Sequence, residues 1–340
     1  GLMNGAAIDR LSDELGSELA IMKGRVDGLE ARVNGIEAGS FSDTTTMGGT
    51  AGFLIGATDS ASDANDKVMM EYFYEVDLNT SFTGEDKLNI EIETGNHPGI
   101  GVGADKVGLD WGSDNGDTLK VSDVNYTFPL GGWTVAVGDS MDASKTWPNA
   151  CAVNNMVDNL GDCGAANSVD LSGDVSLSAS TEFGDGWELG LGISADSGET
   201  SRGIFTNEGD DYYGIAIGYE RDTFGFTAAY SMKESTTIAN STTGWVQSDN
   251  ASQKDTTYYG LVGYYSPEST PLTLSGGIEL SDIEGTNTDK TQWTVGVSTD
   301  LGEGTLSATF GTNGAIADNA EEIYAYDLSY EYPLNDSMSI

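Results

Sequence analysis

The chain has 340 residues and holds 55 Asp and Glu against 14 Lys and Arg, a formal net charge of −41. A protein this negative repels nucleic acid and anionic lipid surfaces and concentrates cations, which excludes a nucleic-acid-binding protein. No run of eighteen apolar residues occurs, so no transmembrane helix is expected. The average hydropathy is typical of a soluble protein, but a membrane β-barrel gives the same average because its lumen-facing half is polar.

The N-terminal part of the chain has a heptad pattern. Apolar residues recur at alternating steps of four and three, which is typical of a coiled-coil seam. Arg25 and Arg32 occupy positions from which they can reach Glu30 and Glu37 of a neighbouring parallel helix. Three internal glycines each cost roughly 1 kcal/mol relative to alanine, so the helix needs partner helices; a lone amphipathic helix packed on its own domain is the alternative. The seam consists of Leu15, Leu19, Met22, Val26, Leu29, Val33 and Ile36.

From Met47 onward the period of the pattern changes to two. In MEYFYEVDLNTSF (70–82) apolar and aromatic residues take the even positions, and acidic and polar residues take most of the odd ones. The same alternation returns at 88–93, 187–194 and 324–332. Such segments are strands with one apolar and one polar face.

The connections between these strands alternate between short and long, which is typical of an up-and-down barrel in an outer membrane. Short turns are predicted at 83–86, 129–132, 184–186, 221–223, 266–271, 301–304 and 333–337, and long loops at about 58–66, 96–117, 140–169, 197–210, 234–254, 282–289 and 313–320. We count fourteen strands up to Tyr332 and the start of a fifteenth at Met338. Because such barrels close with an even number of strands, we expect one more hairpin of about 25 residues and sixteen strands in all. The predicted organisation is a helix over 1–38, a linker over 39–45 and a mainly β, antiparallel transmembrane barrel over 46–340.

The segment MKGRVDGLEARVNGIEAGSF (22–41), followed directly by SDTTTMGGTAGFLIGA (42–57), resembles the cyanobacterial outer-membrane porins. In that family an N-terminal S-layer-homology domain binds the peptidoglycan layer, a short coiled coil follows, and a large barrel comes last. The likeness is specific over residues 15–57 and continues beyond them as architecture. This sequence lacks the S-layer-homology domain, so the family implies peptidoglycan binding only for a longer protein that carries it.

The resemblance implies a porin in the cell outer membrane, with the N-terminal helix in the periplasm. General porins resemble one another in forming trimers, so we predict a homotrimer in which three helices meet beneath three barrels. The mixed Val and Leu residues of the seam also allow a dimer. The expected partners are further copies of the chain, outer-membrane lipid, lipopolysaccharide, and small ions and polar solutes.

The loop from Ser140 to Val169 is the longest and the third on its rim. In general porins the third loop folds inward and narrows the pore, so the resemblance implies a constriction here. Carboxylates along the lumen would favour cations, as they do in cation channels; alternatively, these acids only solvate loops and lumen walls. The candidate pore residues are Glu71, Glu75, Asp77, Glu91, Glu93, Asp139, Asp142, Lys145, Asp158, Asp162 and Asp170.

Cys151 and Cys163 are the two cysteines of the chain, and both lie in this loop. In a protein of the cell envelope, a close pair in one loop is typical of a disulfide. A zinc site would need further ligands, and the single histidine, His97, lies in another loop. We predict a disulfide that holds the loop in one shape, with a zinc site or a reactive thiol as the alternatives.

Other motifs carry less information. GIGVG (99–103) suggests a phosphate-binding loop, but it does not open a helix in a βαβ unit. SDNGD (113–117) and NEGDD (207–211) could bind Ca²⁺, yet neither matches an EF-hand loop, so we expect no cofactor beyond adventitious Ca²⁺ in acidic loops. With one histidine and no Ser/His/Asp set, an enzyme is not expected.

Two other classes of protein remain as alternatives. A trimeric surface adhesin or fibre protein would lack an outward apolar band, since such faces aggregate in water. A substrate-specific outer-membrane transporter, for sugars or a metal chelate, would need aromatic residues along the lumen. The facing of Tyr212, Tyr259 and Trp111 is not determined by the alternation.

Overall fold

The computed structural model describes residues 23, 25, 44–56, 68–96, 115–153, 156–206, 209–234, 255–284, 289–335 and 337–340. Lys23 and Arg25 are both helical. The remainder of the predicted helix, including all seam residues, lies outside the described residues. No helix in the described ranges combines the length and the apolar composition needed to cross a membrane.

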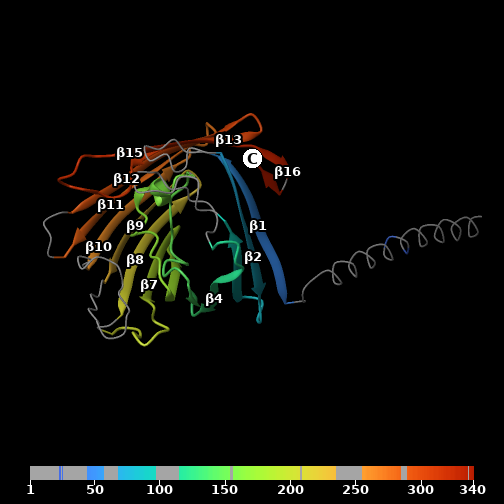
Figure 1. Cartoon of the computed structure of the whole chain (residues 1–340), viewed down its shortest axis with the longest axis vertical. Coiled ribbons are helices and arrows are strands. Elements are labelled where there is room, and N and C mark those ends of the chain that lie inside the picture. The colour runs from blue at the N-terminus through green and yellow to red at the C-terminus, as the bar shows by residue number, and fades with distance from the viewer. Residues whose placement is uncertain are drawn as a thin grey trace, which may run out of the picture.

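The strands form one long antiparallel sheet in which each strand pairs with the next along the chain (Figure 1). The sheet order runs from β1 to β13 and then to β15, and the strands predicted up to Tyr332 are therefore confirmed. The bounds are β1 (Thr45–Gly56), β2 (Met69–Thr80), β3 (Lys87–Gly95), β4 (Lys120–Leu130), β5 (Trp133–Asp139), β6 (Val175–Phe183), β7 (Trp187–Asp196), β8 (Asp210–Arg221), β9 (Phe224–Lys233), β10 (Thr256–Tyr265), β11 (Leu272–Ile283), β12 (Lys290–Leu301), β13 (Gly304–Thr312) and β15 (Tyr324–Glu331).

Three details differ from the sequence-based prediction. The loop expected at 313–320 contains β14 (Ile316–Ala317), which pairs with β12. The strand expected from Met338 does not extend the long sheet, because β17 (Met338–Ser339) pairs with β16 (Pro333–Asn335) in a separate hairpin. The long loop expected at 140–169 contains a short 3₁₀ segment, η1 (Asp158–Gly164). Closure of the sheet into a barrel of sixteen strands stays a prediction.

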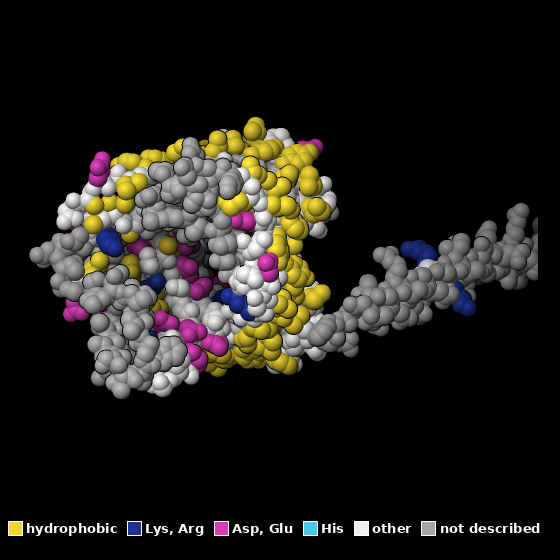
Figure 2. Space-filling model, in the orientation of Figure 1, with side chains coloured by type: hydrophobic (Ala, Val, Ile, Leu, Met, Phe, Trp, Pro, Cys, Tyr) yellow, Lys and Arg dark blue, Asp and Glu magenta, His cyan; other side chains and the backbone are white. Residues whose placement is uncertain are grey.

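The two faces of the sheet differ as the alternation predicts. The sheet curls around a central space, with apolar side chains over its outer surface and carboxylates around the hollow (Figure 2). On β7 the outward residue Leu191 is 41% exposed, whereas the inward residue Ser194 is 3% exposed. Ser194 is covered from the inside, and that cover is the loop after β5.

Aromatic side chains gather toward both ends of the outer surface. Near the short turns, Trp187 packs against Tyr219 (4.9 Å between ring centroids) and Phe226 (5.7 Å). Toward the long-loop ends, the ring of Phe310 lies 5.6 Å from that of Trp293 and 5.4 Å from that of Tyr324. Two aromatic girdles flanking an apolar band are typical of transmembrane β-barrels.

The first short turn is held by one carboxylate. Asp86 accepts hydrogen bonds from the Ser81 hydroxyl (2.9 Å), from the Thr83 amide (2.7 Å) and from the Tyr126 hydroxyl (2.6 Å). The Tyr126 hydroxyl, followed by the donors of the turn, holds the pKa of Asp86 well below its usual range. The ionised carboxylate therefore joins β2, β3 and β4 at the short-turn end.

Candidate functional site

Carboxylates gather on the inner face of β2, β3 and β4. The strand registers place Glu75 opposite Glu93, and Asp77 opposite Glu91, which also lies opposite Asp123. Directly opposed residues of antiparallel strands have Cβ atoms about 4.5–5.5 Å apart. We call this surface the acidic wall; it consists of Glu71, Glu75, Asp77, Glu91, Glu93 and Asp123.

Polar neighbours hold some of these carboxylates in place. The Asn89 amide donates to Asp77 (2.7 Å), and the Asn125 amide donates to Asp123 (3.0 Å). Lys120 forms an ion pair with Glu93 (3.0 Å). A second lysine, Lys145, lies 3.3 Å from Asp123. Two cations offset only part of the repulsion among six carboxylates, so this surface keeps a strongly negative field.

The loop between β5 and β6, residues 140–174, lies on the inner face of the other half of the sheet, and we call it the internal loop. Its backbone amides donate to side chains of successive strands: Thr146 to Ser178 of β6 (3.1 Å), and Ala150 to Thr227 of β9 (3.2 Å). Farther along, the amide of Met156 donates to Asp327 of β15 (3.1 Å). The internal loop therefore runs along the inner face of the sheet from β6 to β15.

Glycines of the wall make room for the internal loop. A Cβ atom on Gly190 of β7 or on Gly214 of β8 would lie 2.6 or 2.7 Å from the indole ring of Trp147. One on Gly218 would lie 2.5 Å from Pro148. Such contacts are too short for any side chain, so the loop can dock only where the wall has none. Trp147 is 9% exposed in this position.

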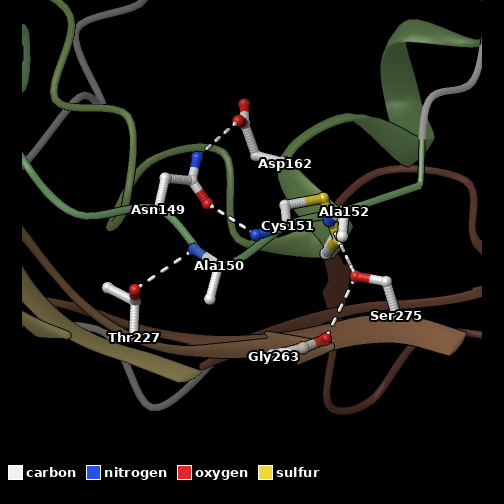
Figure 3. The surroundings of a disulfide bond; sticks show 9 residues. Asn149, Ala150, Cys151, Ala152, Asp162, Thr227, Gly263 and Ser275 are labelled. Carbon is white, nitrogen blue, oxygen red and sulfur yellow. Dashed lines mark hydrogen bonds between the residues drawn. A yellow bond between two sulfur atoms is a disulfide. The ribbon is translucent and has the colours of Figure 1, made fainter. Parts of the chain in front are cut away.

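The disulfide ties two points of the internal loop together beside the wall (Figure 3). Cys151 and Cys163 are bonded, with their Cα atoms 5.6 Å apart. Next to Cys151, the Ala152 amide donates to the Ser275 hydroxyl (3.0 Å), which in turn donates to the Gly263 carbonyl (3.0 Å). The bonded pair thus lies against β10 and β11.

The start of the internal loop carries charged groups. Lys145 reaches Asp123 of the acidic wall at 3.3 Å. The Asp142 side chain is accessible to water but surrounded by protein; burial and then the nearby charge of Asp170 raise its pKa to about 6. Asp170 accepts a hydrogen bond from the Ser144 hydroxyl (2.9 Å). Asp142 is therefore an acid whose charge changes in a mildly acidic solution.

The structure separates the candidate pore residues into groups. Glu71, Glu75, Asp77, Glu91 and Glu93 lie together on the acidic wall, and Asp139, Asp142, Lys145 and Asp170 lie around the start and end of the internal loop. Asp162 lies farther along the loop, where the Asn149 amide donates to it (3.4 Å). The side chain of Asp158, together with His97 and Trp111, lies outside the described residues.

Sequence reasoning missed Asp123, Lys233 and Glu279. Asp123 lies after a register shift between β3 and β4, and this shift breaks the simple alternation. Glu279 lies on the same face of β11 as Ser275, Gly277 and Ser281. A single acidic residue among small inward residues was the sequence signal that could have identified it. No group of three or more His, Cys, Asp or Glu side chains arranged to hold a metal ion occurs in the described part of the chain.

No family model matches the chain. An uncharacterized protein of Nostoc sp. (strain PCC 7120) is 26% identical over 391 residues, which cover 98% of this chain and 67% of that protein. Among solved structures, a mutant of the Rh. blastica porin has a TM-score of 0.55 at 15% identity, with 87% of this chain and 92% of the porin covered. The trimer form of OmpT, an outer membrane protein of Vibrio cholerae, has a TM-score of 0.53 at 14% identity, with 86% of each chain covered. These likenesses show the fold of outer-membrane porins.

Proposed function

We propose that this chain forms a porin of the cyanobacterial outer membrane, a passive channel for small hydrophilic solutes and inorganic ions that prefers cations. The observation that carries the proposal is the acidic wall on β2–β4, on the same inner face of the sheet as the internal loop. The partial exposure of Glu75, Asp77 and Glu91 supports contact of these carboxylates with water in the lumen.

The arrangement of the acidic wall favours a functional role over a structural one. Like charges placed directly opposite in a sheet destabilise it, whereas opposite charges would contribute roughly 0.2–1 kcal/mol for each pair. Each of the two opposed pairs, Glu75–Glu93 and Asp77–Glu91, therefore lacks the stabilisation that a pair of opposite charges would give. A negative lumen wall concentrates cations and repels anions, in the manner of carboxylate rings in cation channels.

The proposal extends to partners. A homotrimer agrees with the trimer form of the structurally similar OmpT, and the predicted helix over 1–38 would add a coiled coil on the periplasmic side. The apolar outer band and its aromatic girdles would contact outer-membrane lipid and lipopolysaccharide. Binding to peptidoglycan would be the role of an N-terminal domain of the kind found in the resembled family. The Nostoc relative supports the proposal that this porin is cyanobacterial.

The alternative functions receive less support from the structure. A surface adhesin has no use for the outward apolar band. A sugar transporter would need free aromatic faces in the lumen, but Tyr259 packs outside against Tyr230 (5.4 Å). Tyr212 faces inward, and the Lys233 ammonium lies over its ring at 5.6 Å. Tyr259 therefore does not face the lumen, and one side of the Tyr212 ring is covered by Lys233.

The test is single-channel recording in a planar bilayer under a salt gradient. We compare the wild type with Glu75→Gln/Glu91→Gln, and with Glu85→Gln/Glu268→Gln, which removes the same charge from exposed short turns. A cation about 8 Å from one carboxylate gains about 0.5 kcal/mol in water. After salt screening, losing two such charges should lower the cation-to-anion permeability ratio about two- to fivefold.

The control variant should keep the wild-type reversal potential. Folded wild-type protein that conducts no ions would contradict the channel. A channel whose reversal potential is unchanged by Glu75→Gln/Glu91→Gln would contradict the role of the acidic wall.

A further inference from the structure

One short stretch of the internal loop, Asn167–Ser168, sits in a recess formed by β9, β10 and β11. Gly260 of β10 lies at the bottom of the recess, where a Cβ atom would lie 2.0 Å from the Ser168 hydroxyl. The register places Gly260 directly opposite Glu279 of β11. Because Gly260 has no side chain, Ser168 of the internal loop can approach the wall beside the Glu279 carboxylate.

The Glu279 carboxylate accepts four hydrogen bonds from these two loop residues. One carboxylate oxygen accepts from the Asn167 side-chain amide (3.0 Å). The other accepts from the Asn167 backbone amide (2.9 Å), the Ser168 backbone amide (2.7 Å) and the Ser168 hydroxyl (2.7 Å). Glu279 is 2% exposed and Ser168 is fully buried. Hydrogen bonds to an ionised acceptor are roughly twice as strong as neutral ones.

The opposite side of the recess holds Asn167 from β9. The Ser231 hydroxyl donates to the Asn167 carbonyl (2.6 Å), and the Lys233 ammonium donates to its side-chain oxygen (3.2 Å). The Asn167 amide group is thereby held between a cation and an anion from two different strands. Lys233 is itself placed by the rings of Tyr212 and Tyr258, at 5.6 and 5.8 Å.

Neutral side chains fix the earlier part of the internal loop to the wall, through Thr227 and Ser275. A buried carboxylate is a costly choice for a purely structural contact, because it must be stripped of water. When the loop leaves, however, Glu279 and Lys233 face a water-filled lumen and become hydrated. The second half of the loop is therefore held by charged contacts, whereas the first half is held by neutral ones.

We propose that Glu279, together with Lys233, is the positioning pair that holds the second half of the internal loop against β9–β11 and so sets the width of the passage. This inference rests on the proposed channel function. It assigns the conductance of the channel to a contact that lies away from the acidic wall.

The experiment compares unit conductance and ion selectivity of the full chain in planar bilayers with KCl. Glu279→Ala and Glu279→Gln remove the charge from the wall. Asn167→Ala/Ser168→Ala removes the two side-chain donors to Glu279 and the Asn167 oxygen that Lys233 contacts, and it leaves the two backbone donors in place. Ser281→Ala is the matched control, because Ser281 is the next inward residue on β11 and donates to the Lys290 carbonyl (3.4 Å). Heat-modifiable migration in gels confirms that each variant is folded.

We expect the wall-side and loop-side variants to shift unit conductance in the same direction, by at least about 1.5-fold, since both free the same loop segment in the pore. Their ion selectivity should change in opposite directions. In Asn167→Ala/Ser168→Ala the Glu279 carboxylate loses two of its four donors, so its charge is less compensated and raises cation preference. Glu279→Ala removes one of the carboxylates that act on Lys233, beside Asp170 and Asp142, and lowers cation preference. A merely structural role would reduce the yield of folded protein without this opposed pair of shifts.

Wild-type unit conductance in Glu279→Gln and in Asn167→Ala/Ser168→Ala would overturn the inference and leave the proposed channel intact. If Glu279→Ala does not fold, these two milder variants decide the question. Absence of conductance in the folded wild type would instead contradict the proposed function itself.

Discussion

Replacing Trp147 by alanine should undock the first half of the internal loop while the sheet stays folded. The indole ring fills the space left by Gly190 and Gly214 and is 9% exposed. A buried Trp→Ala change costs about 3–5 kcal/mol; we take the lower end, about 3 kcal/mol, because lumen water can enter the vacated space. That free energy corresponds to a shift of roughly 100-fold in the docking equilibrium.

Hydrogen exchange measured by mass spectrometry in detergent tests this value. The amides of Thr146 and Ala150, which donate to wall hydroxyls in the docked loop, should exchange about 100-fold faster in Trp147→Ala. Trp187→Ala is the matched control, since Trp187 lies on the outer face of β7 and packs against Tyr219. Trp147→Phe should keep most of the protection, because the indole nitrogen has no hydrogen-bond partner in the described structure. Unchanged exchange in Trp147→Ala, or equal acceleration in Trp187→Ala, would refute the reasoning.

Three further predictions concern charge and covalent bonding. Burial and Asp170 raise the pKa of Asp142 to about 6, so its carboxylate loses its charge as the pH falls through 6. The cation preference, measured from reversal potentials, should therefore decrease between pH 7 and 5. Asp142→Asn should remove this pH-dependent decrease. Because the pKa of Asp86 is lowered, its contribution to stability is present above the ordinary pKa of an aspartate, about 4, and is lost in more acidic solution. Asp86→Asn should lower the thermal unfolding temperature at pH 7, and Tyr126→Phe should lower it to a smaller extent. Equal unfolding temperatures at pH 7 would show that the turn does not need the charge. Cys151→Ser breaks the disulfide, whose stabilising free energy is about 3 kcal/mol in the chain-entropy model. Because contacts with the wall also hold this segment, the exchange rate of the loop amides should rise by less than that free energy implies. Loss of the whole sheet fold would show that the disulfide has a larger role.

The strands were predictable because two independent signals agree along the whole chain. Alternation of side chains defines each strand, and the alternation of short and long connections defines their order. The strand predicted to start at Met338 is present, but its expected pairing with the long sheet is wrong. Three residues after Tyr332 suffice for a local hairpin, and Tyr332 and Ile340 exchange backbone hydrogen bonds (2.6 and 2.8 Å). Local pairing of this kind leaves no periodic pattern to distinguish it from a longer strand.

The path of the internal loop was not predictable from its own sequence, because the information lies in the wall. Glycines at inward positions are needed wherever the loop approaches: Gly190 and Gly214 under Trp147, Gly260 under Ser168. In a strand, glycine is otherwise unfavourable, and it often marks a site where another backbone comes close. Inward glycines that recur on neighbouring strands, as on β7 and β8, are therefore a usable sequence signal for an internal segment.

The two halves of the inner face have different compositions for one physical reason. A loop that docks on a wall removes that wall from water, and a carboxylate buried there without partners would be strongly destabilising. The fully buried acid under the loop, Glu279, accordingly has four donors. The opposed carboxylates of the acidic wall, such as Glu75 and Glu93, lie on β2–β4, where they keep partial exposure to water. The carboxylates proposed to select ions thus lie on β2–β4, whereas the residues that hold the loop lie on other strands. It follows that changes to the acidic wall should alter ion selectivity with little effect on loop protection, and that Trp147→Ala should alter loop protection without removing the negative field.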